Sequence, residues 1–488
     1  MRWLGGGLGA IALLAAAAIL IPPSAAPLPD ADRSYLIQRV RIVDVETGAI
    51  GAPTSVTVRD GRIAAIGAAD AAGLRVVDGG GGWLIPGLWD MHVHTFQLSP
   101  QMHLPLFVAN GVTSVRDMMD CPGVRDSLIA CVADKRRWTA AAAEGQMASP
   151  RFVAVASYYL DKPSLTPADV RAQIAAAAGR GIDAVKVYNR LTPTAYRAAA
   201  EAARAHRLRL VGHLPQAVSL EAAIAAGQSS FEHGHLLVRH CFREGAAWRA
   251  GRLAGADPTS LAEAMVRDHE PAACGRAFDA MRTAGVALVP THVTREEDAR
   301  ATDPAFVDDA RLAHLDPLSR WAYRDDLNGT ATHYPGPRGA AALRAYFDHG
   351  LRLTGAARRA GVRVLVGTDT GVGGLRYHDE MAHLVRAGLT PAEVLRAATI
   401  DAARHQGLDR ESGSITVGKR ADLVLLAGDP IANIANSRSI RAVFLAGRLY
   451  DRDGLDALTD FNRGQAGNPA NWVRLLWGFA RSSVAADL

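Results

Sequence analysis

The sequence has no long run of lysine or arginine and no internal repeat. Its formal net charge of +5 is spread along the 488 residues rather than gathered in blocks. A chain that tracks a nucleic-acid backbone carries a basic stripe or patch, so no nucleic-acid partner is expected. Because no repeat has a period of 20 to 50 residues, a solenoid is excluded. A hydrophobic content of 49% and a charged content of 21% are typical of a globular protein rather than a disordered one.

The N-terminus lacks an apolar run long enough to be an ordinary membrane span. Arg2 precedes an Ala/Leu/Ile-rich stretch at residues 8–21, which is shorter than the roughly 20 residues that cross a bilayer. Small residues at 24–26 suit a cleavage site. We therefore predict that residues 1–26 are a secretory signal peptide and that the protein is exported, to the periplasm or the medium. An uncleaved N-terminal anchor is the alternative, and no other membrane contact is expected.

Cysteine is scarce, with four residues in the chain: Cys121, Cys131, Cys241 and Cys274. None lies beside the predicted cleavage site, so a lipid anchor there is not supported. In an oxidising compartment an even number of cysteines permits disulfides, although a sequence cannot fix their connectivity. We favour the pairs 121 with 131 and 241 with 274, since each would close a loop-like insertion after a predicted strand. Four buried free thiols are the alternative.

The two ends of the chain share a pattern of short strands and turns. Residues 35–43 are rich in β-formers, and residues 55–59 face residues 62–66 across Asp60-Gly61, a strong hairpin signal because both turn positions need positive φ. Similar runs return at residues 414–417, 421–426, 440–445 and 449–450. Two such β segments, at residues 33–82 and 411–455, can complete one small domain. The role of the tail, residues 456–488, stays open among packing on the protein, covering a partner subunit and touching a membrane.

From residue 83 to residue 410 the pattern changes to strands that alternate with Ala-rich helices, which indicates βα units and a parallel sheet. Helices are expected at residues 167–180, 193–206, 220–226 and 391–406, with Thr192, Ser219 and Thr390 as N-caps. Two connections, 234–282 and 291–350, are too long for simple turns. The eight predicted strands end near His94, Arg116, Ala156, Tyr188, His213, His233, Pro290 and Asp369.

The run at residues 84–94 carries the first chemical signal. His92 and His94 lie two residues apart near the end of an apolar strand, so their side chains project to the same side. Two convergent imidazoles suit a divalent metal such as zinc. The histidines of an isolated His-x-His more often only form hydrogen bonds. Other ligand-type residues must therefore decide whether this pair binds a metal.

Four further ligand-type residues end later strands: Lys186, His213, His233 and Asp369. In a (β/α)8 barrel the carboxyl ends of the strands form one face, where residues far apart in sequence meet. With these residues in order, the chain resembles the amidohydrolase superfamily, in its binuclear branch with a carbamylated lysine, and is similar to the imidazolonepropionase-like and Xaa-Pro dipeptidase-like members. The resemblance implies an α/β fold, a (β/α)8 TIM barrel with a small β-sandwich domain built from both chain ends. It also suggests a homo-oligomer, although no sequence feature demonstrates one.

The resemblance implies two divalent metal ions, zinc by ligand type, with Lys186 carrying carbon dioxide as a bridging carbamate. Burial lowers a lysine pKa and frees the amine for that chemistry. A structural lysine neutralised by a buried carboxylate is the alternative. One metal is assigned to His92, His94, the carbamate and Asp369, and the other to the carbamate, His213 and His233. A hydroxide bridging the metals would attack the substrate, and Asp369 would act as general base and then general acid.

Several residues near the strand ends are candidates for substrate binding. Tyr188 would point to the same face as Lys186, and His235 forms a second His-x-His with His233. His292 and Arg295 follow the seventh strand and could hold an anionic group, as could Arg190. His378 and Glu380 could form hydrogen bonds around the site. Each of these also has an ordinary structural explanation, as a core, capping or solvated residue.

The sequence therefore predicts an exported, metal-dependent amidohydrolase that hydrolyses a C–N amide bond of a small-molecule substrate, a dipeptide or an N-acyl amino acid. Hydrolysis of a cyclic amide or another ring is the alternative within the superfamily. A non-catalytic barrel that serves as a scaffold or binding protein is the alternative of another class, because a fold alone does not fix a function.

Overall fold

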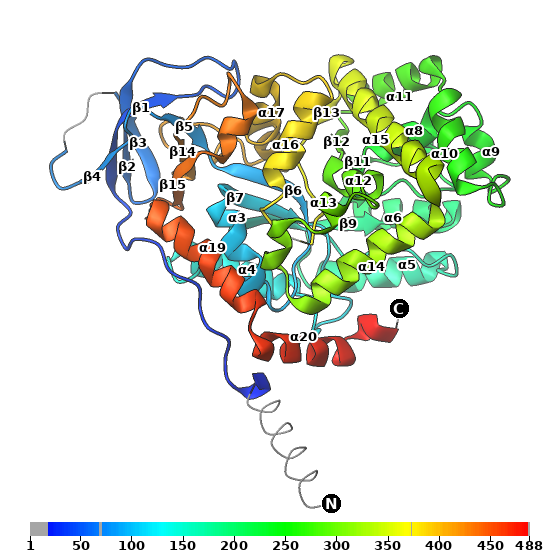
Figure 1. Cartoon of the computed structure of the whole chain (residues 1–488), viewed down its shortest axis with the longest axis horizontal. Coiled ribbons are helices and arrows are strands. Elements are labelled where there is room, and N and C mark those ends of the chain that lie inside the picture. Colours follow the sequence, from blue (N-terminus) through cyan, green and yellow to red (C-terminus); the bar gives the residue numbers. More distant parts are fainter. Residues whose placement is uncertain (1–17, 68–70, 372, 487–488) are drawn as a thin grey trace, which may run out of the picture.

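The computed structural model describes residues 18–67, 71–371 and 373–486 (Figure 1). Most of the predicted signal peptide, residues 1–26, lies outside these ranges. Within them, no helix combines the length and the apolar character needed to cross a membrane.

Both ends of the chain contribute strands to one mixed sheet, on the left in Figure 1. The order of its neighbours is β16-β15-β14-β5-β1-β2-β3, and β4 pairs with β1. Strand β5 pairs with β1 from the N-terminal region and with β14 from the C-terminal region. The strands are β1 (Tyr35–Ile42), β2 (Thr54–Arg59), β3 (Arg62–Ile66), β4 (Arg75–Asp78), β5 (Trp83–Pro86), β14 (Leu423–Leu426), β15 (Ile440–Leu445) and β16 (Arg448–Tyr450).

The hairpin predicted around Asp60-Gly61 is confirmed. Strands β2 and β3 are antiparallel, and the two turn residues have φ of 50° and 78°. The strand predicted at residues 414–417 is wrong, because this segment is a loop. It turns where Lys419 Nζ donates a hydrogen bond to Ser414 Oγ and the Lys419 amide donates to the Thr416 carbonyl. These local bonds replace a partner strand.

The middle of the chain forms two parallel sheets, so the predicted α/β class with parallel strands is confirmed. One sheet has the order β6-β7-β8 and the other β13-β12-β11-β10-β9. Main-chain hydrogen bonds join them at both sides, from Ser157 to Ala184 beside β9 and from Met91 to Val366 beside β13. The strands are β6 (Leu88–Val93), β7 (Val112–Asp117), β8 (Arg151–Val155), β9 (Ala184–Val187), β10 (Arg209–Gly212), β11 (Gln228–Glu232), β12 (Ala287–Val289) and β13 (Arg363–Val364).

Helices separate the parallel strands, as expected. Thr192 and Ser219 cap their helices by accepting a hydrogen bond from the amide three residues on, as predicted. The helices up to β11 are α2 (Ser99–Met102), α3 (Leu104–Ala109), α4 (Val132–Ala143), α5 (Pro167–Gly179), α6 (Pro193–Ala205) and α7 (Leu220–Ala225).

The two long connections contain helices of their own. After β11 come α8 (His235–His240), α9 (Gly245–Arg249), α10 (Pro258–Arg267) and α11 (Pro271–Thr283). After β12 come α12 (His292–Ala299), α13 (Pro304–Val307), the 3-10 helix η1 (Ala310–His314), α14 (Pro317–His333) and α15 (Gly336–Arg359), and after β13 comes α16 (Tyr377–Arg386).

The single helix predicted at residues 391–406 is wrong, because the structure contains two helices, α17 (Pro391–Ala397) and α18 (Ile400–Gln406). Thr399 breaks the run with φ of −139° and ψ of −93°. The carbonyl of Ala398 accepts a hydrogen bond from the Trp89 amide of β6, and the Thr399 hydroxyl donates to the Leu395 carbonyl. The tertiary bond from Trp89 and the local bond of Thr399 turn the chain where the helical pattern alone would continue. The Thr390 cap is confirmed.

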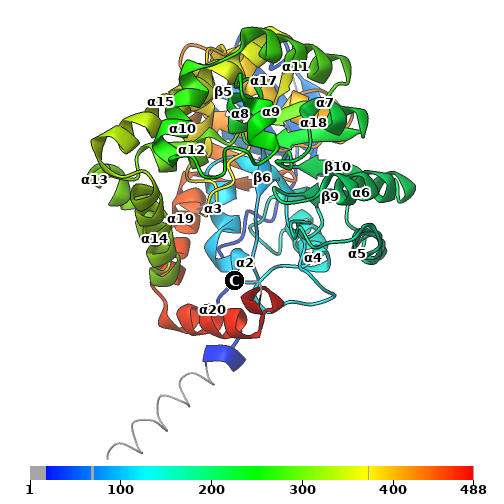
Figure 2. The ribbon, with the colours of Figure 1, turned by 90° about the vertical axis from the view of Figure 1, so that its right-hand side faces the viewer.

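The C-terminal region contains η2 (Ile434–Arg438) between β14 and β15, and then α19 (Arg452–Ala466), α20 (Pro469–Arg481) and η3 (Ser483–Ala486). Helix α19 packs against α3 and α2. Helix α20 lies at the end of the molecule where the N-terminal segment enters, in both views (Figures 1 and 2).

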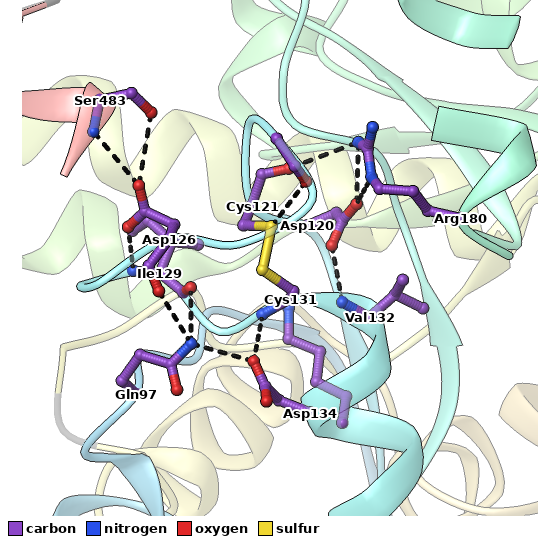
Figure 3. The surroundings of a disulfide bond; sticks show 12 residues. Gln97, Asp120, Cys121, Asp126, Ile129, Cys131, Val132, Asp134, Arg180 and Ser483 are labelled. Atoms are coloured by element: carbon purple, nitrogen blue, oxygen red, sulfur yellow. Dashed lines mark hydrogen bonds and ion pairs between the residues drawn. A yellow bond between two sulfur atoms is a disulfide. The ribbon is translucent and has the colours of Figure 1, made fainter. Parts of the chain in front are cut away.

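Both favoured disulfides are present, Cys121–Cys131 and Cys241–Cys274, and no cysteine is free. The first, shown in Figure 3, closes a loop after β7. Asp126 organises this loop by accepting hydrogen bonds from the amides of Leu128 and Ile129. The alternative of four free thiols is therefore wrong.

Candidate metal centre

Six predicted ligands lie at or just beyond the carboxyl ends of parallel strands. His92 belongs to β6 and Lys186 to β9, and the other four follow β6, β10, β11 and β13. The ends of parallel strands meet at one edge, which brings these distant residues together. The six residues are His92, His94, Lys186, His213, His233 and Asp369.

Asp369 is at the centre of the imidazoles. Its Oδ1 lies 3.1 Å from His94 Nε2 and 3.5 Å from His92 Nε2, and its Oδ2 lies 3.6 Å from His233 Nε2. His213 Nε2 is 2.9 Å from His233 Nε2. The ligand atoms of His92, His233 and Asp369 all lie within 4.8 Å of one another. This is the spacing expected of groups that share an ion.

The opposite ring nitrogen of three of these histidines is held by a neighbour. The Nδ1 atoms of His92, His213 and His233 lie 3.1 Å from Glu232, 2.9 Å from Asn189 and 2.7 Å from Thr291, respectively. Such contacts fix the orientation of metal-binding imidazoles. Each Nε2 atom is left to face the centre.

The donor atoms fit a divalent cation. His92 Nε2 is buried and has no hydrogen-bond partner among the described residues. His213 Nδ1 faces the acceptor oxygen of Asn189, so the proton of the neutral ring lies on Nδ1. The lone pair of His213 Nε2 then points toward His233. A cation among these atoms would give His92 Nε2 a partner and would separate the close nitrogen atoms of His213 and His233.

The ionisation states also suit a metal. Burial lowers the pKa of His233 to about 3 and that of His213 well below its usual value. Burial alone would raise the pKa of Asp369, but the imidazoles of His92 and His94 hold it well below its usual value. Neutral imidazole and ionised carboxylate are the forms that bind metals.

Lys186 lines the same 300 Å³ cavity as His94 and Asp369. Its side chain is buried, and burial lowers its pKa. Among the described residues no carboxylate oxygen lies within 4.0 Å of its Nζ. The alternative of a lysine neutralised by a directly paired carboxylate therefore has no support.

The backbone is strained at the centre. His233, Thr291 and Asp369 have φ of 70°, 46° and 54°, a left-handed region that residues other than glycine rarely adopt. Such strain persists only where the surrounding structure imposes it, and it gathers at functional sites. All three residues follow parallel strands, so the chain bends sharply just where it carries these groups.

A buried ion pair of Arg116 and Glu232 supports His92, and the sequence did not predict it. Arg116 donates to both Glu232 oxygens at 2.8 and 2.9 Å, and Ser230 donates to Glu232 Oε1 at 2.7 Å. Both charged side chains are almost fully buried. The only available signal was the position of Glu232 directly before His233 at the end of a strand.

Two of the predicted substrate residues lie near the centre. The Tyr188 ring contacts His213, with 3.8 Å between the centroids and 35° between the ring planes, and Tyr188 lines the same cavity as Lys186. Burial raises the pKa of its hydroxyl to about 12, so it is a hydrogen-bond donor at neutral pH. His235 stacks beside His233 at 5.6 Å and lies in a pocket with His213 rather than in the Lys186 cavity.

The other candidates point elsewhere. Arg295 pairs with Asp298 at 2.5 Å and lines a separate 480 Å³ cavity, and His292 is buried against Thr354 at 3.0 Å. Arg190 pairs with Asp161 at 2.7 Å and is largely exposed. His378 bonds Ser437, and Glu380 accepts a hydrogen bond from the Val293 amide. These residues hold helices and loops in place around the centre.

Comparisons with known proteins identify a family for most of the chain. Residues 83–450 match the model of the amidohydrolase family. The structure is similar to bottromycin amidohydrolase, with a TM-score of 0.69 and 25% identity over 91% of this chain and 93% of that one. It also resembles a Xaa-Pro dipeptidase, with a TM-score of 0.58 and 20% identity over 86% and 100% of the two chains.

Sequence relatives extend the likeness. An uncharacterized protein of Mycobacterium tuberculosis is 27% identical over 441 residues, which are 84% of this chain and 97% of that protein. Ochratoxinase of Aspergillus niger is 30% identical over 119 residues, 24% of this chain. This alignment spans only about a quarter of the ochratoxinase (25%).

The structural neighbours imply a TIM-barrel-like α/β fold, and in this chain the ligand-type residues gather at the ends of parallel strands. The chain belongs to the amidohydrolase family. The resemblance inferred from its six ligand-type residues is thereby confirmed.

Proposed function

We propose that the protein is an exported amidohydrolase that uses two divalent metal ions, zinc by ligand type, to hydrolyse the amide bond of a dipeptide or an N-acyl amino acid. The observation that carries the proposal is the convergence of His92, His94, His213 and His233 on Asp369 beside the buried Lys186. Both disulfides are consistent with export.

The proposal also includes a closed barrel and a small β-sandwich domain. The two parallel sheets would be one (β/α)8 barrel, since main-chain hydrogen bonds link them beside β9 and beside β13. The mixed sheet would be the small β-sandwich built from both chain ends. These assignments follow the eight-strand pattern of the family.

His92, His94 and Asp369 would hold one metal ion, and His213 and His233 the other, with Lys186 contributing to both as a carbamate. The short distance between His213 Nε2 and His233 Nε2, 2.9 Å, supports a shared ion on that side. Bound divalent ions would supply a nucleophile near neutral pH and polarise the scissile carbonyl.

The chain's own residues would manage protons and position. Asp369 would take a proton from the attacking water on its carboxylate and deliver it to the leaving amine. The Tyr188 hydroxyl would donate a hydrogen bond to the developing oxyanion or to a substrate carboxylate. Glu232, Asn189 and Thr291 would keep three imidazoles oriented throughout.

The test is metal analysis together with a substrate panel. Purified with zinc and bicarbonate, the protein should retain about two equivalents of metal, and a chelator should abolish hydrolysis until metal is restored. Xaa-Pro, Xaa-Arg and N-acetyl amino acid substrates would be compared with cyclic amides. Cleavage of cyclic amides alone would favour the ring-hydrolase alternative. Far less than one equivalent of metal and no product from any substrate would favour the scaffold.

A further inference from the structure

A second cavity adjoins the cavity of the metal centre. It has a volume of 340 Å³, within the range of small-molecule sites. The two cavities share Phe96, His103, Thr370 and Gly371 in their walls, and the metal-side cavity contains Asp369 and Lys186. A substrate whose amide lies at the centre could therefore extend directly into this space.

The walls of the second cavity are largely apolar. They come from the chain after β6, from the disulfide loop, from the α13–α14 region and from α20. The apolar lining residues are Phe96, Leu98, Met102, Leu128, Phe306, Leu312, Leu315, Ala322, Tyr323 and Leu475.

The charged side chains in these walls already have partners. Arg376 pairs with Glu297 at 3.2 Å, and Arg311 pairs with Asp309 at 2.6 Å. Asp316 accepts hydrogen bonds from two amides at the start of α14. Arg376, Arg311 and Asp316 therefore leave no unpaired counter-ion for a charged ligand group. An apolar group would instead bury its surface against the apolar side chains of the wall.

We propose that this cavity is a substrate subsite for a bulky apolar group, an acyl chain or an aromatic ring attached to the scissile amide. The inference rests on the proposed amidohydrolase function and specifies its substrate class. The preferred substrates are then N-acyl amino acids with large apolar acyl groups rather than N-acetyl amino acids.

The test compares N-acyl derivatives of one amino acid, from acetyl to decanoyl. Each buried methylene should raise kcat/KM about threefold to fourfold until the cavity is full. Leu475→Asp places a charge in the cavity wall and should lower kcat/KM for the decanoyl substrate at least tenfold while sparing the acetyl substrate. Val417→Asp is the matched control, because Val417 is an apolar residue that is 56% exposed and does not line the cavity.

A binding measurement separates this inference from the proposed function. The neutral fluorophore N-phenyl-1-naphthylamine should bind the wild type, and Leu475→Asp should weaken that binding more than Val417→Asp does. Hydrolysis that is independent of acyl length, with equal fluorophore binding by both variants, would overturn the subsite and leave the amidohydrolase intact. Fluorophore binding as expected without hydrolysis of any amide would overturn the proposed function alone.

The outer surface of α20 exposes several large apolar side chains. Leu476, Trp477 and Phe479 are 54%, 46% and 42% exposed, which is unusual for such side chains. With Trp472, Val473 and Ala480 they occupy one side of the helix at helical spacing. A contiguous exposed apolar helix face marks a contact with something else.

The inner side of α20 is firmly attached. Ser127 of the disulfide loop donates to the Gly478 carbonyl at 2.8 Å, and a Cβ at Gly478 would lie only 2.7 Å from the Ser127 carbonyl oxygen. Asp126 of the same loop accepts a hydrogen bond from the Ser482 hydroxyl beyond the helix end. It also accepts hydrogen bonds from Ser483, which Figure 3 shows. These contacts fix the helix without using its apolar outer side.

The N-terminal segment meets the protein at the same place. Arg474 of α20 donates to the Ile21 carbonyl at 2.5 Å, and Leu20 and Ile21 are 79% and 62% exposed. The sequence that leads into this point, residues 8–21, is almost entirely apolar. Both views show the segment reaching the protein beside α20 (Figures 1 and 2).

We propose that the outer face of α20 lies on a lipid bilayer, which selects one of the three roles that the sequence left open for residues 456–488. Tryptophan favours the membrane–water interface, and Arg474 and Arg481 on the flank of the face would meet anionic headgroups. The sequence of residues 8–21 is apolar, and its described part at Leu20 and Ile21 lies beside α20, which argues for lipid as the occupant. Leu475 would then bring the apolar cavity close to the bilayer.

The test uses a single label on the full chain. All four native cysteines are paired, so Leu476→Cys provides one reactive thiol for an environment-sensitive fluorophore. Vesicles of phosphatidylcholine and phosphatidylglycerol should shift its emission to the blue, whereas a label at Glu201→Cys on the exposed side of α6 should not respond. No shift at position 476, or a shift that depends on protein concentration without vesicles, would overturn the proposal and point to coverage by protein.

Discussion

Replacement of Asp369 with asparagine is expected to lower kcat by a factor of about 10² to 10⁴, the usual contribution of general acid–base catalysis. The asparagine side chain keeps an oxygen that can face a bound metal, but it cannot accept a proton and return it. His92 and His94, which lie 3.5 and 3.1 Å from Asp369, remain in place. The measurements are the steady-state rate on the best substrate of the panel and the metal content of the purified variant.

The metal content should stay close to that of the wild type, which separates a lost proton carrier from a lost metal site. Asp279→Asn is the matched control, because Asp279 has a 73% exposed side chain and pairs only locally with Arg282. Its kcat should be unchanged. A wild-type kcat in the Asp369→Asn variant would contradict the role assigned to Asp369.

Replacement of Arg116 with methionine is expected to lower the free energy of unfolding by about 3–5 kcal/mol, because it leaves the Glu232 carboxylate buried without its cation. Arg116 and Glu232 have 2% and 0% exposed side chains. Methionine has a similar reach without a charge, so packing is largely kept. Chemical denaturation followed by circular dichroism measures the change.

The control is Arg171→Met, which removes the exposed Arg171–Glu201 pair and should cost less than about 1 kcal/mol. The double variant Arg116→Met with Glu232→Gln should recover part of the loss, since no charge is then left unpaired. The single variant should also bind metal more weakly, because Glu232 orients His92. An Arg116→Met protein as stable as the Arg171→Met protein would contradict this account of the pair.

Patterns local in the chain were predicted well. The hairpin at Asp60-Gly61 and the caps at Thr192, Ser219 and Thr390 depend on bonds within a few residues, so their sequence is sufficient. The single helix predicted at residues 391–406 failed because a hydrogen bond from Trp89 of β6 ends it at Ala398, and the strand predicted at residues 414–417 failed because hydrogen bonds of Lys419 turn the segment.

The candidate site divides in the same way. The six ligand-type residues carry recognisable chemistry at the ends of apolar runs, so the sequence suggested them. The supports Glu232, Asn189 and Thr291 were missed, because a hydrogen bond across the fold leaves no local pattern. Arg295 and His292 were suggested by their position after a strand, yet their side chains turn to Asp298 and Thr354.

The sequence alone determined the alternation of strands and helices and the set of residues able to hold metal, because side-chain chemistry and hydrophobic spacing are written in the chain. Only the tertiary structure decided which nitrogen faces Asp369, which carboxylate supports His92, and that an apolar cavity opens beside the centre. Those features arise where segments hundreds of residues apart come into contact, and no local preference encodes such a meeting.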